Sequence, residues 1–312
     1  MKRVFRYLYR IPLLLLHVFV GLPVLLLLLN PWTARWSVSG EPLDHWGVGL
    51  WSRIMVRIFG LKMKRFGTPL PGPVLFVANH VSWLDITVLH SQRWMGFVAK
   101  AEIEDWPFIG AIAKRSGTIY HQRGDNASLH GVMHQMLDRL NNGLAVGVFP
   151  EGRTLPGKAI GVFHARIFQP AVLADKPAQP VAIKYGDKGS AQELMAFGPG
   201  ENFFTNLVRV LGEPSRACEV HFLEPVAPGE DGRRKMADAC RHEIAPFAEL
   251  ERAPEHMHTY RVTPLGLWNA RAAGHDAEQV VDSLMRYSRY PVPHALLVDV
   301  AETMARYGRL RL

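Results

Sequence analysis

Two cysteines are few for a chain of 312 residues, and several well-known sequence patterns do not occur at all. So little cysteine excludes a disulfide-stapled scaffold and a multi-cysteine zinc module. The dinucleotide pattern GxGxxG, the phosphate-loop pattern GxxxxGK[ST] and the nucleophile pattern GxSxG do not occur. Nothing therefore predicts dinucleotide binding, ATP binding or a serine hydrolase. Histidines do not combine with cysteines or carboxylates at ligand spacing, so we expect no metal and no cofactor.

Net charge is also lacking over most of the chain. The formal charge is +8, yet residues 66–312 are balanced, and the whole excess lies in residues 1–65. With 48% hydrophobic and 21% charged residues, the chain can bury a core, which excludes intrinsic disorder. Its length exceeds the ~150 residues of a typical domain, which predicts more than one structural unit.

The basic N-terminal region predicts a membrane attachment. Residues 11–29 (IPLLLLHVFVGLPVLLLLL) are uncharged apart from one histidine and would form a helix of roughly 28 Å, close to the hydrocarbon thickness of a bilayer. His45–Phe59 is amphipathic, with Arg53 and Arg57 beside an apolar stripe. We expect a helical pair seated in one leaflet. A cleaved signal peptide and an ordinary core helix are the alternatives for the two segments. Basic residues that suit anionic lipid precede the apolar run: Lys2, Arg3, Arg6 and Arg10.

The middle of the chain alternates short β-rich runs with helix-like segments. The predicted strands are Val74–Ala78, Gly96–Ala99, Thr118–Tyr120, Leu144–Phe149, Ala178–Lys184 and Ala217–Phe222. The predicted helices are Trp83–Ser91, Phe108–Arg115, Ser128–Asn141 and Val162–Asp175. This alternation predicts an α/β fold with a mostly parallel sheet flanked by helices.

Two polar residues follow the first of these strands. His80 comes two residues after the strand, in the loop before the predicted helix, and Asp85 follows five residues later. A carboxylate that holds one imidazole nitrogen lets the other nitrogen accept a proton, so the pair is a candidate general base with its orienting group. Ser82 and Asp85 also match a helix capping box, which would explain the carboxylate without catalysis.

Cations follow three of the other strands. Lys100 and Arg123 come after the second and third strands, and Glu151, Gly152 and Arg153 follow the strand Leu144–Phe149. A glycine allows close backbone approach to a ligand, and an arginine grips phosphate with two hydrogen bonds. Because the carboxyl ends of parallel strands meet at one edge, these residues predict an anion site there.

The blocks NHVSWLD, GTIYHQR, FPEGRT and QPVA occur in this order, and together they resemble the four motif blocks of the glycerolipid acyltransferases, the PlsC-like lysophosphatidic acid acyltransferase family. The resemblance covers about residues 40–242. It implies a glycerolipid acyltransferase fold and transfer of an acyl chain from acyl-CoA or acyl-carrier protein to the free hydroxyl of a lysophospholipid. The first expectation for the acceptor is 1-acyl-glycerol-3-phosphate, which would give phosphatidic acid.

The resemblance also implies roles for individual residues. His80 matches the family's catalytic base, and Asp85 matches its partner. The acceptor-binding blocks match Glu151, Gly152, Arg153 and Arg123. The third block is commonly FPEGTR, whereas here Arg153 precedes Thr154, so another lysolipid, such as a lyso-aminolipid, is an alternative acceptor. A catalytically inactive lipid-binding protein is a further alternative. Direct transfer without an acyl-enzyme is expected, since neither cysteine falls in a block.

The last seventy residues differ from the rest. Residues 263–273 predict a helix, Asp276 can cap a second, and Pro293 precedes a third. Residues 246–312 resemble the N-terminal part of bacterial XPB-type DNA repair helicases through the segments HTYRVTPLGLWNARAAG, YSRYPVP and YGRLRL. None of the helicase motor is present, and the local charge is near balance, so we do not expect a nucleic acid partner.

Three domains follow from these observations: a membrane-anchoring helical segment at 1–65, an acyltransferase domain at 66–242 and a small helical module at 243–312. The expected partners are lysophospholipid, acyl thioester, anionic membrane lipid and acyl-carrier protein. Acyl thioesters and reduced cysteines belong to the cytoplasm. We therefore expect the protein at the inner membrane, with its catalytic domain on the cytoplasmic face.

Overall fold

The computed structural model divides into two compact units, Met1–Glu251 and Arg252–Leu312. In the first unit it describes residues 2–30, 32–105, 109–122, 126–157, 159–229 and 232–248. In the second it describes residues 267–268, 271, 276–287, 292 and 294–306.

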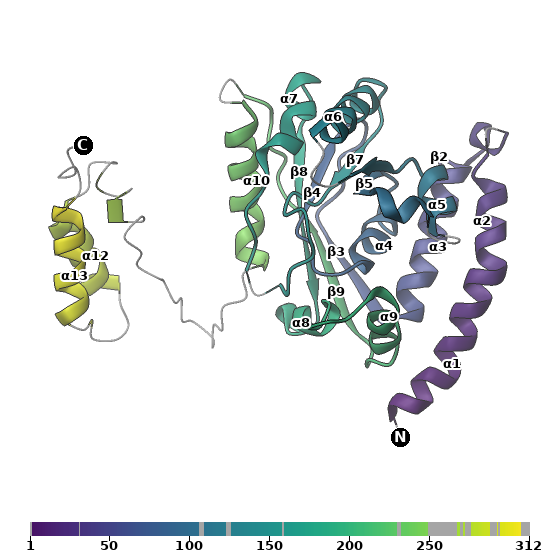
Figure 1. Cartoon of the computed structure of the whole chain (residues 1–312), viewed down its shortest axis with the longest axis horizontal. Helices are drawn as coiled ribbons and strands as arrows, with labels where there is room; N and C mark the ends of the chain where they lie inside the picture. The colour runs from purple at the N-terminus through teal and green to yellow at the C-terminus, as the bar shows by residue number, and fades with distance from the viewer. Residues whose placement is uncertain are drawn as a thin grey trace. The chain divides into compact units, whose positions relative to one another are not determined.

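A seven-stranded sheet forms the centre of the described part of the first unit, in the order β3-β9-β8-β4-β7-β5-β6 (Figure 1). The five neighbours from β8 to β6 are parallel, whereas β9 is antiparallel to β8 and carries β3 parallel to itself. The predicted mostly parallel α/β sheet is therefore confirmed. The strands are β3 Leu61–Phe66, β4 Leu75–Ala78, β5 Gly96–Lys100, β6 Ile119–His121, β7 Val146–Val148, β8 Ala178–Tyr185 and β9 Arg216–Phe222.

Strand β3 is the element that sequence patterns missed. Its residues LKMKRF fall at the end of the predicted N-terminal segment, yet they pair along their whole length with β9. It is an edge strand, and Lys62, Lys64 and Arg65 on it are exposed. Exposed lysine on an edge strand discourages pairing with another chain, which explains why a basic segment is suited to the edge of the sheet.

Helices cover both faces of the sheet. Alternate residues of β4 enter two separate cores, with Phe76 in one and Leu75 and Val77 in the other, as the period of a strand requires. One core includes residues of α3 Leu43–Ile58, α4 Leu84–His90 and α9 Phe203–Leu211. The other includes residues of α6 Asn126–Asn141, α7 Gln169–Leu173 and α10 Gly232–Ala248. The remaining regular elements are short: β1 Ser37–Val38, β2 Glu41–Pro42, α5 Ile109–Arg115, α8 Gln192–Met195 and the 3₁₀ turns Thr33–Arg35, Ala101–Asp105, Ala165–Phe168 and Asp187–Gly189.

The single helix predicted at Val162–Asp175 was wrong in extent. The structure has a 3₁₀ turn at Ala165–Phe168, followed by the short helix α7. Pro170 lies at the start of α7, where its missing N–H and fixed φ are tolerated. The apolar run therefore marks burial rather than one continuous helix.

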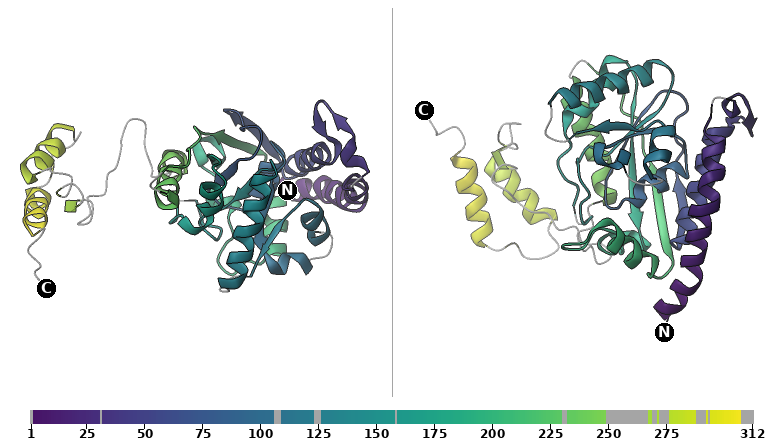
Figure 2. Two further views of the ribbon diagram at one scale, coloured as in Figure 1. Left: turned by 90° about the horizontal axis from the view of Figure 1, so that it is seen from above. Right: turned by 45° about the vertical axis from the view of Figure 1, so that its right-hand side comes forward.

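The N-terminal region is one long helical rod made of α1 Lys2–Leu16, a π-helical turn at His17–Gly21 and α2 Leu22–Leu28. It is long and apolar enough to cross a membrane. One stripe of it is buried from Arg10 onward, and α2 packs against α3 (Figure 2). That stripe comprises Arg10, His17, Leu22, Leu25 and Leu29. The rod is therefore docked along the body, and its attachment in one leaflet stays a prediction.

Arg10 is not the lipid-facing cation that its position in the sequence suggested. Its side chain is only 1% exposed. It donates to the carbonyls of Leu211 and Glu213 at 2.9 and 2.7 Å and to the Ser215 hydroxyl at 3.0 Å. The charge of Arg10 thus holds α1 to the body.

The second unit contains α12 Ala277–Tyr287 and α13 His294–Ala305. Leu267, Val300 and Met304 form a small core of their own. Asp276 accepts a hydrogen bond from the backbone N–H of Gln279 at 2.8 Å, so the predicted cap is present. The helix predicted at residues 263–273 lies mostly outside the described residues. Helix α10 runs to Ala248, past the predicted domain boundary at 242.

Candidate active site

His80 and Asp85 meet where β4 ends and α4 begins. His80 lies just after β4, Asp85 is the second residue of α4, and the His80 Nδ1 atom lies 2.9 Å from Asp85 Oδ2. Residues five apart on one helix would point about 140° away from each other. The pair therefore exists because a loop separates the histidine from the helix, as the sequence predicted.

Asp85 is completely buried and accepts hydrogen bonds through both oxygens. Oδ2 accepts from the backbone N–H groups of Val81 and Ser82 at 2.7 and 2.8 Å, in addition to His80. Oδ1 accepts from the Tyr185 hydroxyl at 2.5 Å. One carboxylate oxygen thus bonds both the His80 ring and the Ser82 backbone N–H, although Ser82 is not the N-cap residue of α4. A carboxylate can only accept, so Nδ1 of His80 carries hydrogen and Nε2 is the acceptor of the neutral ring.

Tyr185 is a site residue that sequence reasoning missed. It is the last residue of β8 and is fully buried. Burial, and then the charge of Asp85, raise the pKa of its hydroxyl well above the usual value. The hydroxyl therefore stays protonated and donates to Asp85. The only sequence signal was its place three residues after the fourth motif block.

The His80 ring has a fixed orientation. It stacks on Phe149 with ring centroids 4.0 Å apart, and its side chain is 17% exposed. Its backbone carbonyl accepts from the Leu155 N–H at 2.8 Å. Nε2 forms no hydrogen bond with the part of the chain that the structure describes, so this nitrogen is available to a substrate.

Glu151 is buried and faces the His80–Asp85 pair, called the dyad below, rather than solvent. Its Oε1 accepts from the His80 backbone N–H at 3.3 Å, and the carboxylate also accepts from the Gly161 N–H. Burial raises its pKa to about 7, and the charge of Asp85 adds to this rise, whereas the bonds and Arg241 oppose it. Glu151 thus holds the backbone of the loop that carries His80.

The other predicted residues lie along the same edge of the sheet. Gly152 has a φ of +69°, a conformation that glycine adopts without strain and that turns the chain after β7. Arg153 is exposed next to it, and Lys100 is exposed at the end of β5. Neither cation bonds a described residue. Arg123 lies outside the described residues.

Asn79 is a second residue that the sequence did not single out as functional. Its side-chain amide donates to the Ile183 carbonyl at 3.1 Å, and its oxygen accepts from the Ile183 N–H at 2.8 Å. These two bonds tie the end of β4 to β8. They therefore fix the distance between the His80 loop and Tyr185.

Neither cysteine has the properties of a nucleophile. Cys218 and Cys240 are both buried, and burial raises the pKa of the Cys240 thiol to about 12 and that of Cys218 well above its usual value. Protonated buried thiols do not attack an ester. Among the described residues no group of three histidine, cysteine or carboxylate side chains is placed to hold a metal ion.

Comparison with known proteins identifies relatives of the first unit. The family model described as Acyltransferase matches residues 64–184. The 1-acyl-sn-glycerol-3-phosphate acyltransferase of Neisseria gonorrhoeae is 35% identical over 196 residues, which are 61% of this chain and 77% of that protein. The lyso-ornithine lipid O-acyltransferase of Pseudomonas aeruginosa is 34% identical over 172 residues, 55% of this chain and 66% of that protein.

The fold has a solved counterpart. The crystal structure of the 1-acyl-sn-glycerophosphate acyltransferase PlsC from Thermotoga maritima superposes with a TM-score of 0.60 at 16% identity. The match covers 81% of this chain and all of that one. At this identity the likeness concerns the fold alone, and it agrees with the predicted acyltransferase architecture.

The end of the chain has different relatives. The family model described as Helicase conserved C-terminal domain matches residues 224–312. The DNA 3'-5' helicase XPB of Kineococcus radiotolerans is 86% identical over 76 residues, which are 24% of this chain but only 14% of the helicase. The predicted resemblance to XPB-type helicases is confirmed, and it concerns about one seventh of such a protein.

Proposed function

Because this chain belongs to the acyltransferase family, we propose that it transfers an acyl chain from an acyl thioester to the free hydroxyl of a lysolipid. The observation that supports this most directly is the His80–Asp85 pair, with Nδ1 held by the carboxylate and Nε2 open. The same arrangement argues against an inactive lipid-binding protein, since His80 and Asp85 are both present and lie within hydrogen-bonding distance of each other.

The proposed reaction is a single displacement. An alcohol is far too weak an acid to attack a thioester unaided at neutral pH, so a general base must act at the hydroxyl. His80 Nε2 takes the hydroxyl proton while the oxygen bonds to the acyl carbonyl carbon. Asp85 stabilises the imidazolium that forms. The carbon–sulfur bond then breaks, the thiolate leaves, and the proton on His80 neutralises it.

For the acceptor we propose 1-acyl-glycerol-3-phosphate, which gives phosphatidic acid. The exposed cations Arg153 and Lys100 on the carboxyl edge suit a phosphate monoester. The order of arginine and threonine in FPEGRT, together with relatives named lyso-ornithine lipid O-acyltransferase, favours a lyso-aminolipid as the second candidate. The donor is acyl-CoA or acyl-carrier protein.

We further propose that the enzyme is attached to the cytoplasmic face of the inner membrane through α1, α2 and α3. Anionic lipid is its proposed surface partner. A cavity of about 260 Å³ between α3 and β3 is lined by Arg53, Arg57 and Lys62. These three cations have no hydrogen-bonding or ion-pair partner among the described residues, so they are available to lipid phosphate.

The decisive test is His80→Ala in the full chain, assayed in membranes with both lysolipids and with both donors. Loss of the base should lower turnover by ~10²–10⁴-fold. His134→Ala is the matched control, because that histidine is 75% exposed on α6. Turnover of the His80 variant near that of the control would refute the proposed mechanism. Lysolipid binding with no turnover by the unaltered chain would instead identify an inactive binding protein.

A further inference from the structure

Helix α9 exposes large apolar side chains although its other side is packed into the core. Phe204 is 73% exposed and Val208 is 51% exposed, and one turn separates them, so they lie on one face. Leu194 of the preceding short helix α8 is exposed as well. On the opposite side Asn206 and Val210 are buried, and Leu211 is buried where the helix ends. The exposed face of α9 therefore remains apolar after the fold is complete.

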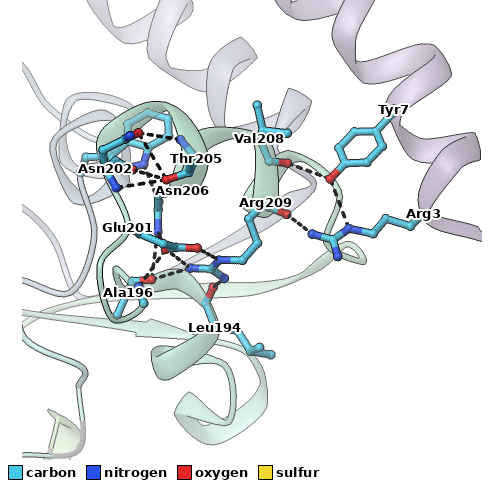
Figure 3. Close-up of polar contacts among 12 residues, drawn as sticks. Arg3, Tyr7, Leu194, Ala196, Glu201, Asn202, Thr205, Asn206, Val208 and Arg209 are labelled. Carbon is cyan, nitrogen blue, oxygen red and sulfur yellow. Dashed lines mark hydrogen bonds and ion pairs between the residues drawn. The ribbon is translucent and has the colours of Figure 1, made fainter.

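Helix α9 is tied to the N-terminal rod at its C-terminal end (Figure 3). Four side chains on one stripe of α1 donate hydrogen bonds to backbone carbonyls of the last turn of α9 and the residues just after it, where the helix dipole is negative. The bonds run from Arg3 to Arg209 O, from Arg6 to Gly212 O, from Tyr7 to Val208 O, and from Arg10 to Leu211 O and Glu213 O. These contacts place Val208 directly beside α1.

The polar groups around α9 are satisfied within the protein. Asn202 and Thr205 form a capping box at its start. Glu201 pairs with Arg209, and this contact holds the pKa of the carboxyl group at about 2 (Figure 3). Arg209 also donates to the carbonyls of Leu194 and Ala196 at 2.6 and 2.7 Å. The position of α9 is thus fixed, and the apolar exposure is not a frayed end.

The same helix contacts the catalytic loop. The indole N–H of Trp83 donates to the side-chain oxygen of Asn206 at 3.0 Å, and Phe203 packs edge-on against the same indole. Trp83 lies two residues before Asp85. A surface that holds α9 would therefore hold the loop that carries the base.

We propose that Leu194, Phe204 and Val208 form a second membrane-contacting surface, which inserts among lipid acyl chains beside α1. This inference rests on the proposed membrane attachment through the N-terminal rod. Helix α1 exposes large apolar side chains of its own, Val4, Phe5 and Leu8. Bilayer lipid is the occupant because the surface adjoins a helix that is itself apolar enough for a membrane. The lysolipid would then enter next to the loop that carries His80.

The test uses single-cysteine labelling of the full chain with an environment-sensitive fluorophore. The native cysteines are buried and do not compete for label. Labels are placed by Phe204→Cys and Val208→Cys on the proposed surface, by Leu8→Cys on α1, and by Leu173→Cys on α7. Leu173 is the matched control, because it is also apolar and 63% exposed but belongs to the opposite face of the sheet.

Each labelled chain is bound to phosphatidylethanolamine–phosphatidylglycerol vesicles with brominated or ordinary acyl chains. We expect labels at 204, 208 and 8 to lose most of their emission in brominated vesicles, and the label at 173 to keep it. Quenching at 8 without quenching at 204 and 208 would overturn the inference while leaving the attachment through α1 intact. No quenching at any position would refute both. Unaltered circular dichroism checks that each variant folds.

Discussion

The two sides of the carboxyl edge of the sheet differ in what their polar groups bind. On the side of β4 and β8, Asp85 accepts four hydrogen bonds from the protein and is fully buried. On the side of β7 and β5, Arg153 and Lys100 are exposed and bond no described residue. In the proposed mechanism the fold itself thus completes the base, whereas Arg153 and Lys100 would bond only the acceptor. Substitutions should separate the two sides into rate effects and affinity effects.

The largest effect is expected at the orienting carboxylate. Asp85→Asn keeps the shape of the side chain but removes the negative charge that stabilises the His80 imidazolium. An amide nitrogen at the Oδ2 position would also leave the Nδ1 hydrogen of His80 without an acceptor. Turnover should fall by ~10²–10⁴-fold. Steady-state kinetics should show the loss in kcat rather than in the KM for lysolipid. A change confined to KM would place Asp85 in recognition and remove the contrast between the two sides.

A smaller loss is expected from Tyr185→Phe. The variant removes a charge-assisted bond from a buried carboxylate, a change worth ~1.5–3 kcal/mol in comparable cases. With less of its charge stabilised, Asp85 should hold the His80 imidazolium more strongly. The acidic fall of kcat/KM should then move to higher pH, and kcat should fall less than in Asp85→Asn, because the carboxylate is retained but is held in place by one bond fewer.

The pH profile tells positioning from mere packing. A tyrosine that only filled space would alter thermal stability and leave the shape of the profile unchanged. Asn79→Ala is the comparison variant, because Asn79 bonds Ile183 rather than the dyad. It should loosen the β4–β8 distance without removing a bond from Asp85, so its profile should keep the original acidic limb. The same shift in both variants would mean that Tyr185 acts through packing alone.

Glu151 lies between the two sides, since it belongs to the third block but bonds the backbone of His80. Its pKa is raised by burial from an ordinary 4.5 to about 7. The folded state therefore binds this proton more tightly than the unfolded chain, and the associated stability is full below about pH 4.5 and lost as the pH rises through about 7. Thermal unfolding should thus show a fall in stability over this range that Glu151→Gln reduces. An identical slope in both proteins would contradict the buried placement.

On the recognition side we expect affinity effects only. Arg153→Ala should raise the KM for 1-acyl-glycerol-3-phosphate about tenfold, because one charge-assisted bond to phosphate is lost, and should leave kcat near its original value. Lys100→Ala should do the same more weakly, since a lysine makes no bidentate contact. Unchanged KM values for this acceptor, together with a raised KM for lyso-ornithine lipid, would favour the second candidate.

The parts of the site that the sequence predicted are those encoded locally. His80 and Asp85 are five residues apart, and the strand, loop and helix around them each have their own sequence signal. The parallel strands were recognisable as short apolar runs. Their order, and the reversal of β3 and β9 against the others, depends on pairing between distant segments, for which a single sequence carries no signal.

The parts that were missed join residues far apart in the chain. Tyr185 is 100 residues from Asp85, and Arg10 is 201 residues from Leu211. Arg10 illustrates the physical reason. A cation beside an apolar run can bind anionic lipid or the carbonyls at a helix C-terminus equally well. Only the packing of the folded chain determines which of these partners it has.

The smallest effect is expected from removing residues 252–312. The dyad, Tyr185, Glu151 and the α1–α9 contacts all belong to the first unit, and the second unit has its own small core. Its similarity is to helicases, of which it matches 14%. A chain ending at Glu251 should therefore keep the kcat, KM and vesicle binding of the full chain, measured side by side. A loss of turnover with vesicle binding intact would mean that catalysis also depends on the second unit.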